Sequence, residues 1–191
     1  MSFVIMTVGK THSGKTTFGK EIAKKLKHVC LLDSDEIAEF LRDKYPDLYD
    51  KDFVKGSNEL ASGYHLKRMV VLDVYRQALK TKLPIISTSA NSTKKIRTEV
   101  RRLAKKSGRK VIMVYFNLPE TLLVGRIKAS QRSQKCLYHS KDFIDLLVNK
   151  QKQRFEAPNK KEADYFLEIT DEVSGVKAFK EVIKLLKEQV V

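Results

Sequence analysis

A short run of glycine, lysine and hydroxyl residues near the start of the chain carries the clearest chemical signal. The run Gly9-Lys-Thr-His-Ser-Gly14-Lys15-Thr16 has the spacing Gly-x-x-x-x-Gly-Lys-Ser/Thr. Its glycines allow backbone N–H groups to curl around phosphates, and a following helix adds the positive end of its dipole. We expect Lys15 to reach the β- and γ-phosphates and the Thr16 hydroxyl to bind magnesium. The expected nucleotide-binding residues are Gly9, Lys10, Thr11, His12, Ser13, Gly14, Lys15, Thr16 and Thr17, with ATP and Mg²⁺ as the ligands.

Two carboxylates follow the second apolar run of the chain. Residues 28–32 predict a short strand, and Asp33 and Asp35 come directly after it. Ligands of open α/β sheets bind at the carboxyl ends of the strands, so we expect both carboxylates beside the phosphate-binding loop. Phosphorylation of an alcohol benefits from a carboxylate that accepts the hydroxyl proton. We therefore expect Asp35 to act as a general base and Asp33 to join Thr16 at the metal, the alternative for either carboxylate being a helix cap.

The elements that must position these residues alternate between apolar strands and amphipathic helices. Strands are expected at residues 3–8, 28–32, 84–88, 110–116 and 165–169. Helices are expected at about 15–26, 33–43, 58–80, 93–107, 119–130, 141–154 and 176–186. This alternation predicts an α/β chain with the three-layer P-loop NTPase fold, in which a five-stranded, mostly parallel sheet has helices on both faces. A length of 191 residues fits a single domain, residues 1–191.

Composition limits the class of protein further. Hydrophobic residues make up 42% and charged residues 32%, and no apolar run is long enough to span a bilayer, so we expect no membrane partner. The first residues lack the features of a signal peptide, and the two cysteines match no disulfide framework or zinc spacing. These features predict a cytoplasmic protein. The net charge of +15 favours phosphate-bearing partners, including nucleic acid, although solvated lysine-rich helices explain it equally well.

The expected helix at 93–107 has the densest basic face. Its apolar residues Ile96, Val100, Leu103 and Ala104 are expected to face inward. Its cations are expected to lie largely outward: Lys94, Lys95, Arg97, Arg101, Arg102, Lys105 and Lys106. Such a face could follow a phosphate backbone, or it could simply be solvated.

Other classes of nucleotide-binding protein fit less well. The guanine-reading Asn-Lys-x-Asp and the switch Asp-x-x-Gly of regulatory GTPases do not occur at suitable places. The strand at 110–116 ends in Phe116 and Asn117 rather than in the acidic residue that activates water in larger ATPases. Both observations favour transfer of a phosphoryl group over signalling or ATP hydrolysis.

The motifs together resemble the P-loop kinases related to the kinase domain of polynucleotide 5′-hydroxyl kinases, with zeta toxins and small-molecule kinases as more distant relatives. The resemblance covers nearly the whole chain. Beside the phosphate loop, its segments are residues 33–37, residues 85–97, Arg126 with the basic segment that follows, and residues 154–164. The resemblance implies that Asp35 is the base. It also implies that Arg126 and Arg132 are lid arginines that neutralise the transferring phosphoryl group, with a lid at about 130–142.

Two positions depart from that family and leave the acceptor open. Thr88 stands where the family often has aspartate, and Ala38 stands where polynucleotide kinases tend to carry a phosphate-holding arginine, a role that Arg42 could take. The leading prediction is an ATP- and magnesium-dependent kinase that acts on a hydroxyl acceptor, with a polynucleotide 5′-hydroxyl slightly preferred. The alternatives are a nucleoside, nucleotide or small-molecule kinase, for example of an antibiotic or nucleotide sugar, and an ATP-binding, nucleic-acid-associated protein without kinase activity.

Overall fold

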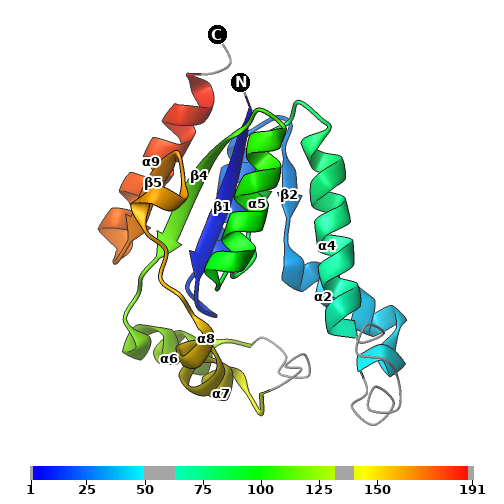
Figure 1. Ribbon diagram of the computed structural model, residues 1–191. Coiled ribbons are helices and arrows are strands. Elements are labelled where there is room, and N and C mark those ends of the chain that lie inside the picture. The colour runs from blue at the N-terminus through cyan, green and yellow to red at the C-terminus, as the bar shows by residue number, and fades with distance from the viewer. Residues whose placement is uncertain (1, 50–62, 132–139, 189–191) are drawn as a thin grey trace.

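Five parallel strands run through the centre of the molecule (Figure 1). The computed structural model describes residues 2–49, 63–131 and 140–188. The strands are β1 (Phe3–Gly9), β2 (Cys30–Leu32), β3 (Ile85–Ser87), β4 (Lys110–Phe116) and β5 (Tyr165–Ile169), in the order β2-β3-β1-β4-β5. Each strand is parallel to its neighbours, which confirms the predicted five-stranded sheet.

Helices connect the strands and cover the sheet. They are α1 (Lys15–Lys25), α2 (Ser34–Lys44), α4 (Gly63–Leu79), α5 (Lys94–Lys106), α6 (Glu120–Ala129), α7 (Phe143–Asp145), α8 (Lys152–Arg154) and α9 (Glu172–Lys187). A π-helical turn, Leu146–Gln151, joins α7 to α8, and short 3₁₀ turns occur at Pro46–Tyr49 and Lys160–Glu162. The predicted start of α4 at residue 58 lies outside the described residues. No helix in the described part of the chain is long and apolar enough to cross a membrane.

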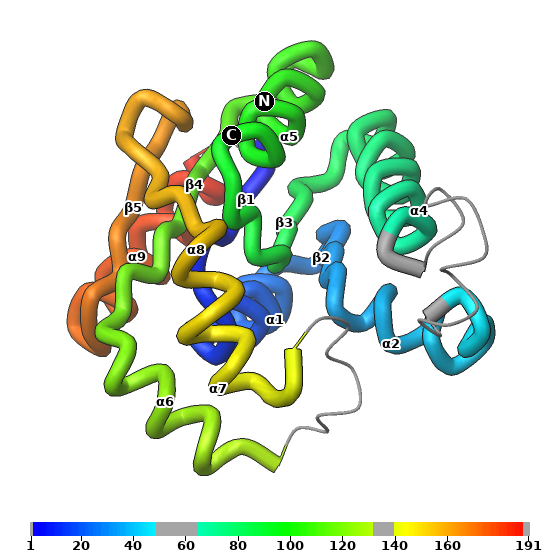
Figure 2. Tube along the Cα trace, turned by 60° about the horizontal axis from the view of Figure 1, so that its bottom comes forward, coloured from blue at the N-terminus to red at the C-terminus, as the bar shows by residue number. Residues whose placement is uncertain are grey.

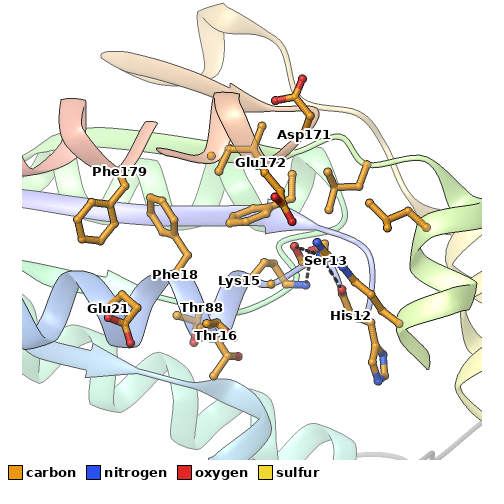
Figure 3. A pocket seen from close by; sticks show the side chains of 18 of the residues that line it. His12, Ser13, Lys15, Thr16, Phe18, Glu21, Thr88, Asp171, Glu172 and Phe179 are labelled. Carbon is orange, nitrogen blue, oxygen red and sulfur yellow. Dashed lines mark hydrogen bonds between the residues drawn. The ribbon is translucent and has the colours of Figure 1, made fainter. Parts of the chain in front are cut away.

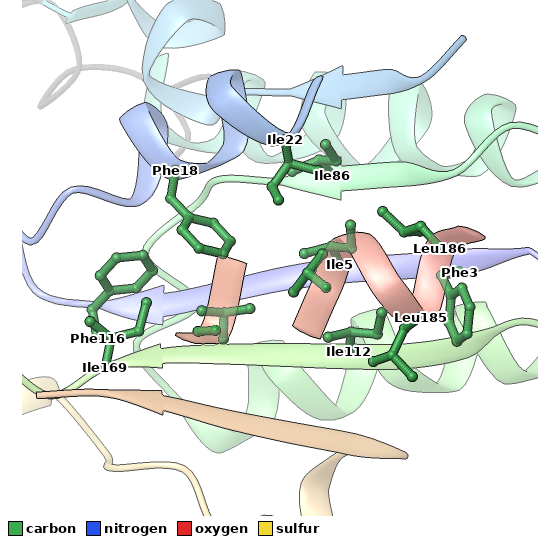
Figure 4. Packing of buried hydrophobic residues seen from close by; sticks show 13 residues of the cluster. Phe3, Ile5, Phe18, Ile22, Ile86, Ile112, Phe116, Ile169, Leu185 and Leu186 are labelled. Atoms are coloured by element: carbon green, nitrogen blue, oxygen red, sulfur yellow. The ribbon is translucent and has the colours of Figure 1, made fainter. Parts of the chain in front are cut away.

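Two apolar layers hold the helices on opposite faces of the sheet. Because successive strand residues point to opposite faces, Phe3 and Ile5 of β1 pack with α1 and α9, while Val4 and Met6 pack with α4 and α5. Figure 4 shows the first layer, with Ile5 between side chains from α1 and α9. Central strands buried on both faces explain the continuous apolar runs in the sequence. The predicted three-layer arrangement is confirmed.

The carboxyl ends of the strands meet at one edge of the sheet. Gly9 at the end of β1 pairs with Phe116 of β4, and Leu32 of β2 pairs with Ser87 of β3. The helices α6, α7 and α8 gather beyond this edge, near the start of α1 (Figures 1 and 2). The loops that follow β1, β2 and β3 therefore open toward a common region.

The predicted basic face of α5 is wrong at one residue. Arg97 is only 1% exposed, and its Nε and Nη2 donate to the two carboxylate oxygens of Glu162 at 2.7 and 3.2 Å. Its Nη1 donates to the backbone oxygens of Asn91 and Glu156. Ile96, which was expected inside, is 36% exposed. The helix is therefore turned so that the guanidinium, rather than the isoleucine, packs under the segment that precedes β5.

The other cations of the basic face lie at the surface, and one of them bonds to the backbone. Arg101 is half-buried, and its Nη1 donates to the carbonyl of Lys161 at 2.9 Å. The exposed cations of this helix are Lys94, Lys95, Arg102, Lys105 and Lys106. Of the seven cations expected on this face, Arg97 is therefore buried, and Arg101 is held at the surface by a backbone carbonyl.

Candidate active site

The phosphate-binding loop connects β1 to α1, where the motif predicted it. A Cβ at Gly9 would lie 2.9 Å from both the Phe116 Cβ and the Ser13 Oγ, so a larger residue does not fit without a shift. Gly14 has a φ of 98° at the N-cap of α1 and makes no side-chain cap there. The first N–H groups of a helix lack intrahelical partners, so this end of α1 is suited to an anion.

Lys15 lies inside the curve of the loop (Figure 3). Its Nζ donates to the carbonyl oxygen of Lys10 at 2.6 Å and to the Ser13 Oγ at 3.3 Å. These contacts hold the ammonium group over the space that the loop encloses. The role of Lys15 at the phosphates stays a prediction.

Thr16 and Asp33 lie together at the foot of the loop. The Thr16 hydroxyl donates to Asp33 Oδ2 at 2.9 Å, although the two residues belong to different helix starts. Asp33 is buried, and its Oδ1 accepts a hydrogen bond from the backbone N–H of Asp35, which caps α2. Magnesium prefers hard oxygen ligands and commonly takes only one or two from the protein. This oxygen pair therefore has the composition expected for the predicted metal site.

Asp35 occupies the first turn of α2, at the carboxyl end of β2. Its side chain is 53% exposed, and Lys67 Nζ from α4 lies 3.9 Å from Asp35 Oδ1. Asp35 lines the same cleft as Lys15 and Thr16, a cavity of about 1340 Å³. The carboxylate and the phosphate-binding loop, which are 20 residues apart in sequence, thus face one volume.

Arg126 of α6 contacts the phosphate-binding loop. Its Nη1 donates to the backbone oxygens of His12 and Ser13 at 3.4 and 3.3 Å, and the residue lines the cleft. Arg132, the second predicted lid arginine, and most of the predicted lid lie outside the described residues. Arg126 is therefore the predicted lid arginine that the structure brings to the loop.

Most of the chain matches a known protein family. The matching family model is described as AAA domain and covers residues 4–158, more than half of the chain. The chain belongs to this AAA domain family. The comparison with curated proteins finds no match.

Three solved structures show the same fold as this AAA domain chain. Kti12 of Chaetomium thermophilum in complex with ADP-AlF3 is 17% identical, with a TM-score of 0.63 over 96% of this chain and 98% of that one. The Mycobacterium tuberculosis APS kinase CysC in complex with AMPPNP and APS is 16% identical, with a TM-score of 0.58 over 97% and 98%. A gluconokinase from Sinorhizobium meliloti is 16% identical, with a TM-score of 0.56 over 98% and 94%. The fold is therefore the α/β fold of P-loop kinases. Two of these three solved structures contain a nucleotide. The three structures do not favour polynucleotide kinases over other P-loop kinases.

Other residues of the predicted loop are held by side chains from elsewhere in the AAA domain. Lys10 Nζ lies 3.5 Å from a carboxylate oxygen of Glu120, and Thr17 is exposed at the cleft. His12 has a φ of 57°, and its ring meets the edge of Phe143 at 4.8 Å between centroids. Figure 3 shows this ring pointing away from Lys15.

One wall of the cleft consists of residues that no sequence motif predicted. The loop after β5 and the start of α9 contribute Thr170, Asp171, Glu172, Val176 and Phe179. Figure 3 shows Phe179 near Phe18, on the far side of the cleft from His12, and their ring centroids are 6.0 Å apart. This wall provides apolar surface within reach of the phosphate-binding loop. No motif marks it, because its residues are ordinary members of a strand end and an amphipathic helix.

Thr88 is buried against α1. It stands where the P-loop kinases that this sequence resembles often have aspartate. Its backbone N–H donates to the carbonyl of Leu32 at 3.0 Å, and its methyl group faces Gly19. A Cβ at Gly19 would lie 2.3 Å from Thr88 Cγ2. The end of β3 is therefore packed directly against the phosphate-loop helix.

We expect Gly19→Ala to lower the free energy of unfolding by about 1–3 kcal/mol, because the added methyl overpacks this contact. Gly125→Ala is the matched control, since it also changes a helical glycine and its new Cβ meets nothing within 4 Å. Thermal melts of both variants and of Gly19→Ala combined with Thr88→Ser measure the effect. The double variant should recover stability because serine lacks the clashing methyl. Equal melting temperatures for the two alanine variants would contradict the packing argument.

Proposed function

We propose that this protein is a kinase that transfers the γ-phosphoryl group of ATP, with Mg²⁺, to a hydroxyl group. The observation that carries the proposal is that Asp35 lines the same cleft as Lys15 and Thr16. A carboxylate in the same cleft as a phosphate-binding loop is suited to accept the proton of an attacking alcohol. Solved relatives that contain ADP-AlF3 or AMPPNP support a nucleotide in this cleft.

Each residue of the site has a separate role in the transfer. Lys15 and the N–H groups at the start of α1 bind the phosphates, and Thr16 with Asp33 would hold the metal, which shields phosphate charge when bound. Arg126, at the loop, is placed to balance charge on the moving phosphoryl group. Asp35 takes the hydroxyl proton as the new O–P bond forms and the bond to ADP breaks. The apolar wall at Val176 and Phe179 offers a surface for the adenine ring of ATP.

A second pocket supports the choice of acceptor. It has a volume of about 210 Å³ and lies between α2, α4, α5 and the end of β3. Its polar lining contains the small residues Ser34, Ser87, Ser89, Asn91 and Ser92, together with the charged residues Lys67, Arg68 and Glu99. Lys67 also forms the 3.9 Å contact with Asp35, which lines the first cavity, so this lysine lies next to both the second pocket and the proposed general base. We infer a small polar acceptor that bears a hydroxyl group, bound by hydrogen bonds in this second pocket.

A polynucleotide 5′-hydroxyl is the second candidate acceptor. The net charge of +15 and the exposed lysines of α5 favour it. The buried ion pair of Arg97 with Glu162 removes one cation from that surface, and the second pocket is small for a nucleotide chain end. We therefore prefer the small polar acceptor, whereas the sequence slightly favoured the polynucleotide 5′-hydroxyl.

Transfer of labelled γ-phosphate from ATP, with magnesium, tests the function. The panel contains polyols and sugars, nucleosides, nucleotide sugars, hydroxyl-bearing antibiotics, and 5′-hydroxyl DNA and RNA oligonucleotides. We expect label on a small molecule with wild-type protein and none with Lys15→Met, which removes the ammonium group. Label on oligonucleotide ends alone would replace the small acceptor with the polynucleotide. Tight ATP binding without transfer to any acceptor would contradict the kinase and favour a nucleotide-binding partner protein.

A further inference from the structure

Gln151 reaches the phosphate-binding loop from a distant part of the chain. Its Oε1 accepts a hydrogen bond from the backbone N–H of Thr11 at 2.8 Å, across 140 positions of sequence. Gln151 is the last residue of the π-helical turn Leu146–Gln151. Such turns are uncommon and frequently occur at functional sites. Nothing in the loop motif or in the pattern of the helix points to this residue.

The bond from Gln151 holds one end of a single peptide unit. The N–H of Thr11 and the carbonyl of Lys10 belong to the same planar peptide, so they point in opposite directions. The Lys10 oxygen accepts the 2.6 Å hydrogen bond from Lys15 Nζ. One peptide of the loop is thus bound at its N–H by Gln151 and at its oxygen by Lys15. Rotation of this peptide would carry the carbonyl away from the ammonium group.

The segment that carries Gln151 is firmly anchored. Leu147, in the same π-helical turn, is fully buried, and Phe143 in the preceding helix is nearly so. Both pack with Leu123 and Ile127 of α6, the helix that also carries Arg126. Figure 2 shows these helices beside the start of α1. The Gln151 carboxamide is therefore carried by a segment whose apolar side chains pack against α6.

We propose that Gln151 is a positioning residue for Lys15. By holding the Lys10–Thr11 peptide, it aims the Lys10 carbonyl at the Lys15 ammonium group and so places that group for the phosphates of the nucleotide. Thr11 is buried, so water is poorly placed to replace the carboxamide. The inference rests on the proposed function only in that the loop binds a nucleotide, and it does not depend on the acceptor or on transfer.

Titration calorimetry with ADP and with ATP tests the proposal on the full chain. Gln151→Met keeps the length of the side chain and removes its oxygen. We expect about tenfold weaker binding of both nucleotides, the size of one lost hydrogen bond to a group that orients a charge. Gln153→Met is the matched control, because Gln153 is an exposed glutamine two residues further along, and it should bind as wild type does.

A second comparison separates positioning from a general structural effect. In a Lys15→Met background, Gln151→Met should cause no further loss of affinity, because the group that Gln151 places is gone. A loss of the same size in both backgrounds, or affinity within twofold of wild type for Gln151→Met, would overturn the proposal. Melting temperatures check folding, and Gln151→Ala takes the place of the methionine variant where the latter melts lower. Because binding is measured rather than transfer, a failed kinase assay leaves this test intact.

Discussion

Asp35→Asn is expected to lower kcat for phosphoryl transfer by about 10²- to 10⁴-fold, the range that a general base contributes. Asparagine has nearly the same size as aspartate but cannot take the proton of the acceptor. The Asp35 side chain is half exposed, and the cap of α2 is made by Asp33 with the backbone N–H of Asp35. The substitution therefore leaves the fold in place, and ATP affinity should stay within about twofold, because the effect falls on the chemical step.

Transfer rates at saturating ATP and acceptor measure this effect, with ATP affinity determined in parallel. Glu36→Gln is the matched control: Glu36 follows Asp35 directly on α2, and its exposed carboxylate pairs with Lys20 at 2.7 Å. It should retain the wild-type rate. If Asp35→Asn retained transfer within about threefold of wild type, the acceptor would be an oxygen that is already anionic. That result would move the assignment to a nucleoside monophosphate kinase.

The features that the sequence predicted correctly depend on local spacing or on the shared edge of a parallel sheet. The loop from Gly9 to Thr16 is one continuous motif whose flanking strand and helix have clear periodicities. Asp33 and Asp35 follow a short apolar strand, and in a parallel sheet that position alone brings them toward the loop. One oxygen of Asp33 caps α2 and the other accepts from Thr16, so the cap uses only one of the two oxygens, and the metal role of Asp33 stays a prediction.

The features that escaped the sequence depend on partners far away in the chain. Helical periodicity assigned Arg97 to solvent, because its partner Glu162 is 65 residues further on and no local pattern reveals it. Gln151 escaped for a related reason, since its partner Thr11 belongs to the loop. A π-helical turn also changes the direction of the side chains that follow it, so a period of 3.6 residues does not give the orientation of Gln151.

The largest stability effect is expected at that misassigned arginine. Arg97→Met should lower the free energy of unfolding by about 3–5 kcal/mol, because it leaves the Glu162 carboxylate buried without its cation. The backbone oxygens of Asn91 and Glu156 lose a donor as well. Urea unfolding at neutral pH measures the change. The double variant Arg97→Met with Glu162→Met should lose less than the single variant, since it removes the stranded charge. A double variant as unstable as the single one would mean that packing, rather than charge, sets the cost.

The pH dependence of stability gives an independent test of the same pair. Burial by itself raises the pKa of Glu162, but hydrogen bonds from Arg97 and the Asn159 backbone, with nearby positive charge, bring this pKa below its ordinary value. A carboxyl whose pKa is lowered by folding stabilises the protein above its unfolded pKa, about 4.3 for glutamate. That contribution is lost as the pH falls through the lower, folded value. Wild-type protein should therefore lose stability below about pH 4.5 more steeply than the double variant, whereas equal slopes would place the acid sensitivity at other carboxylates.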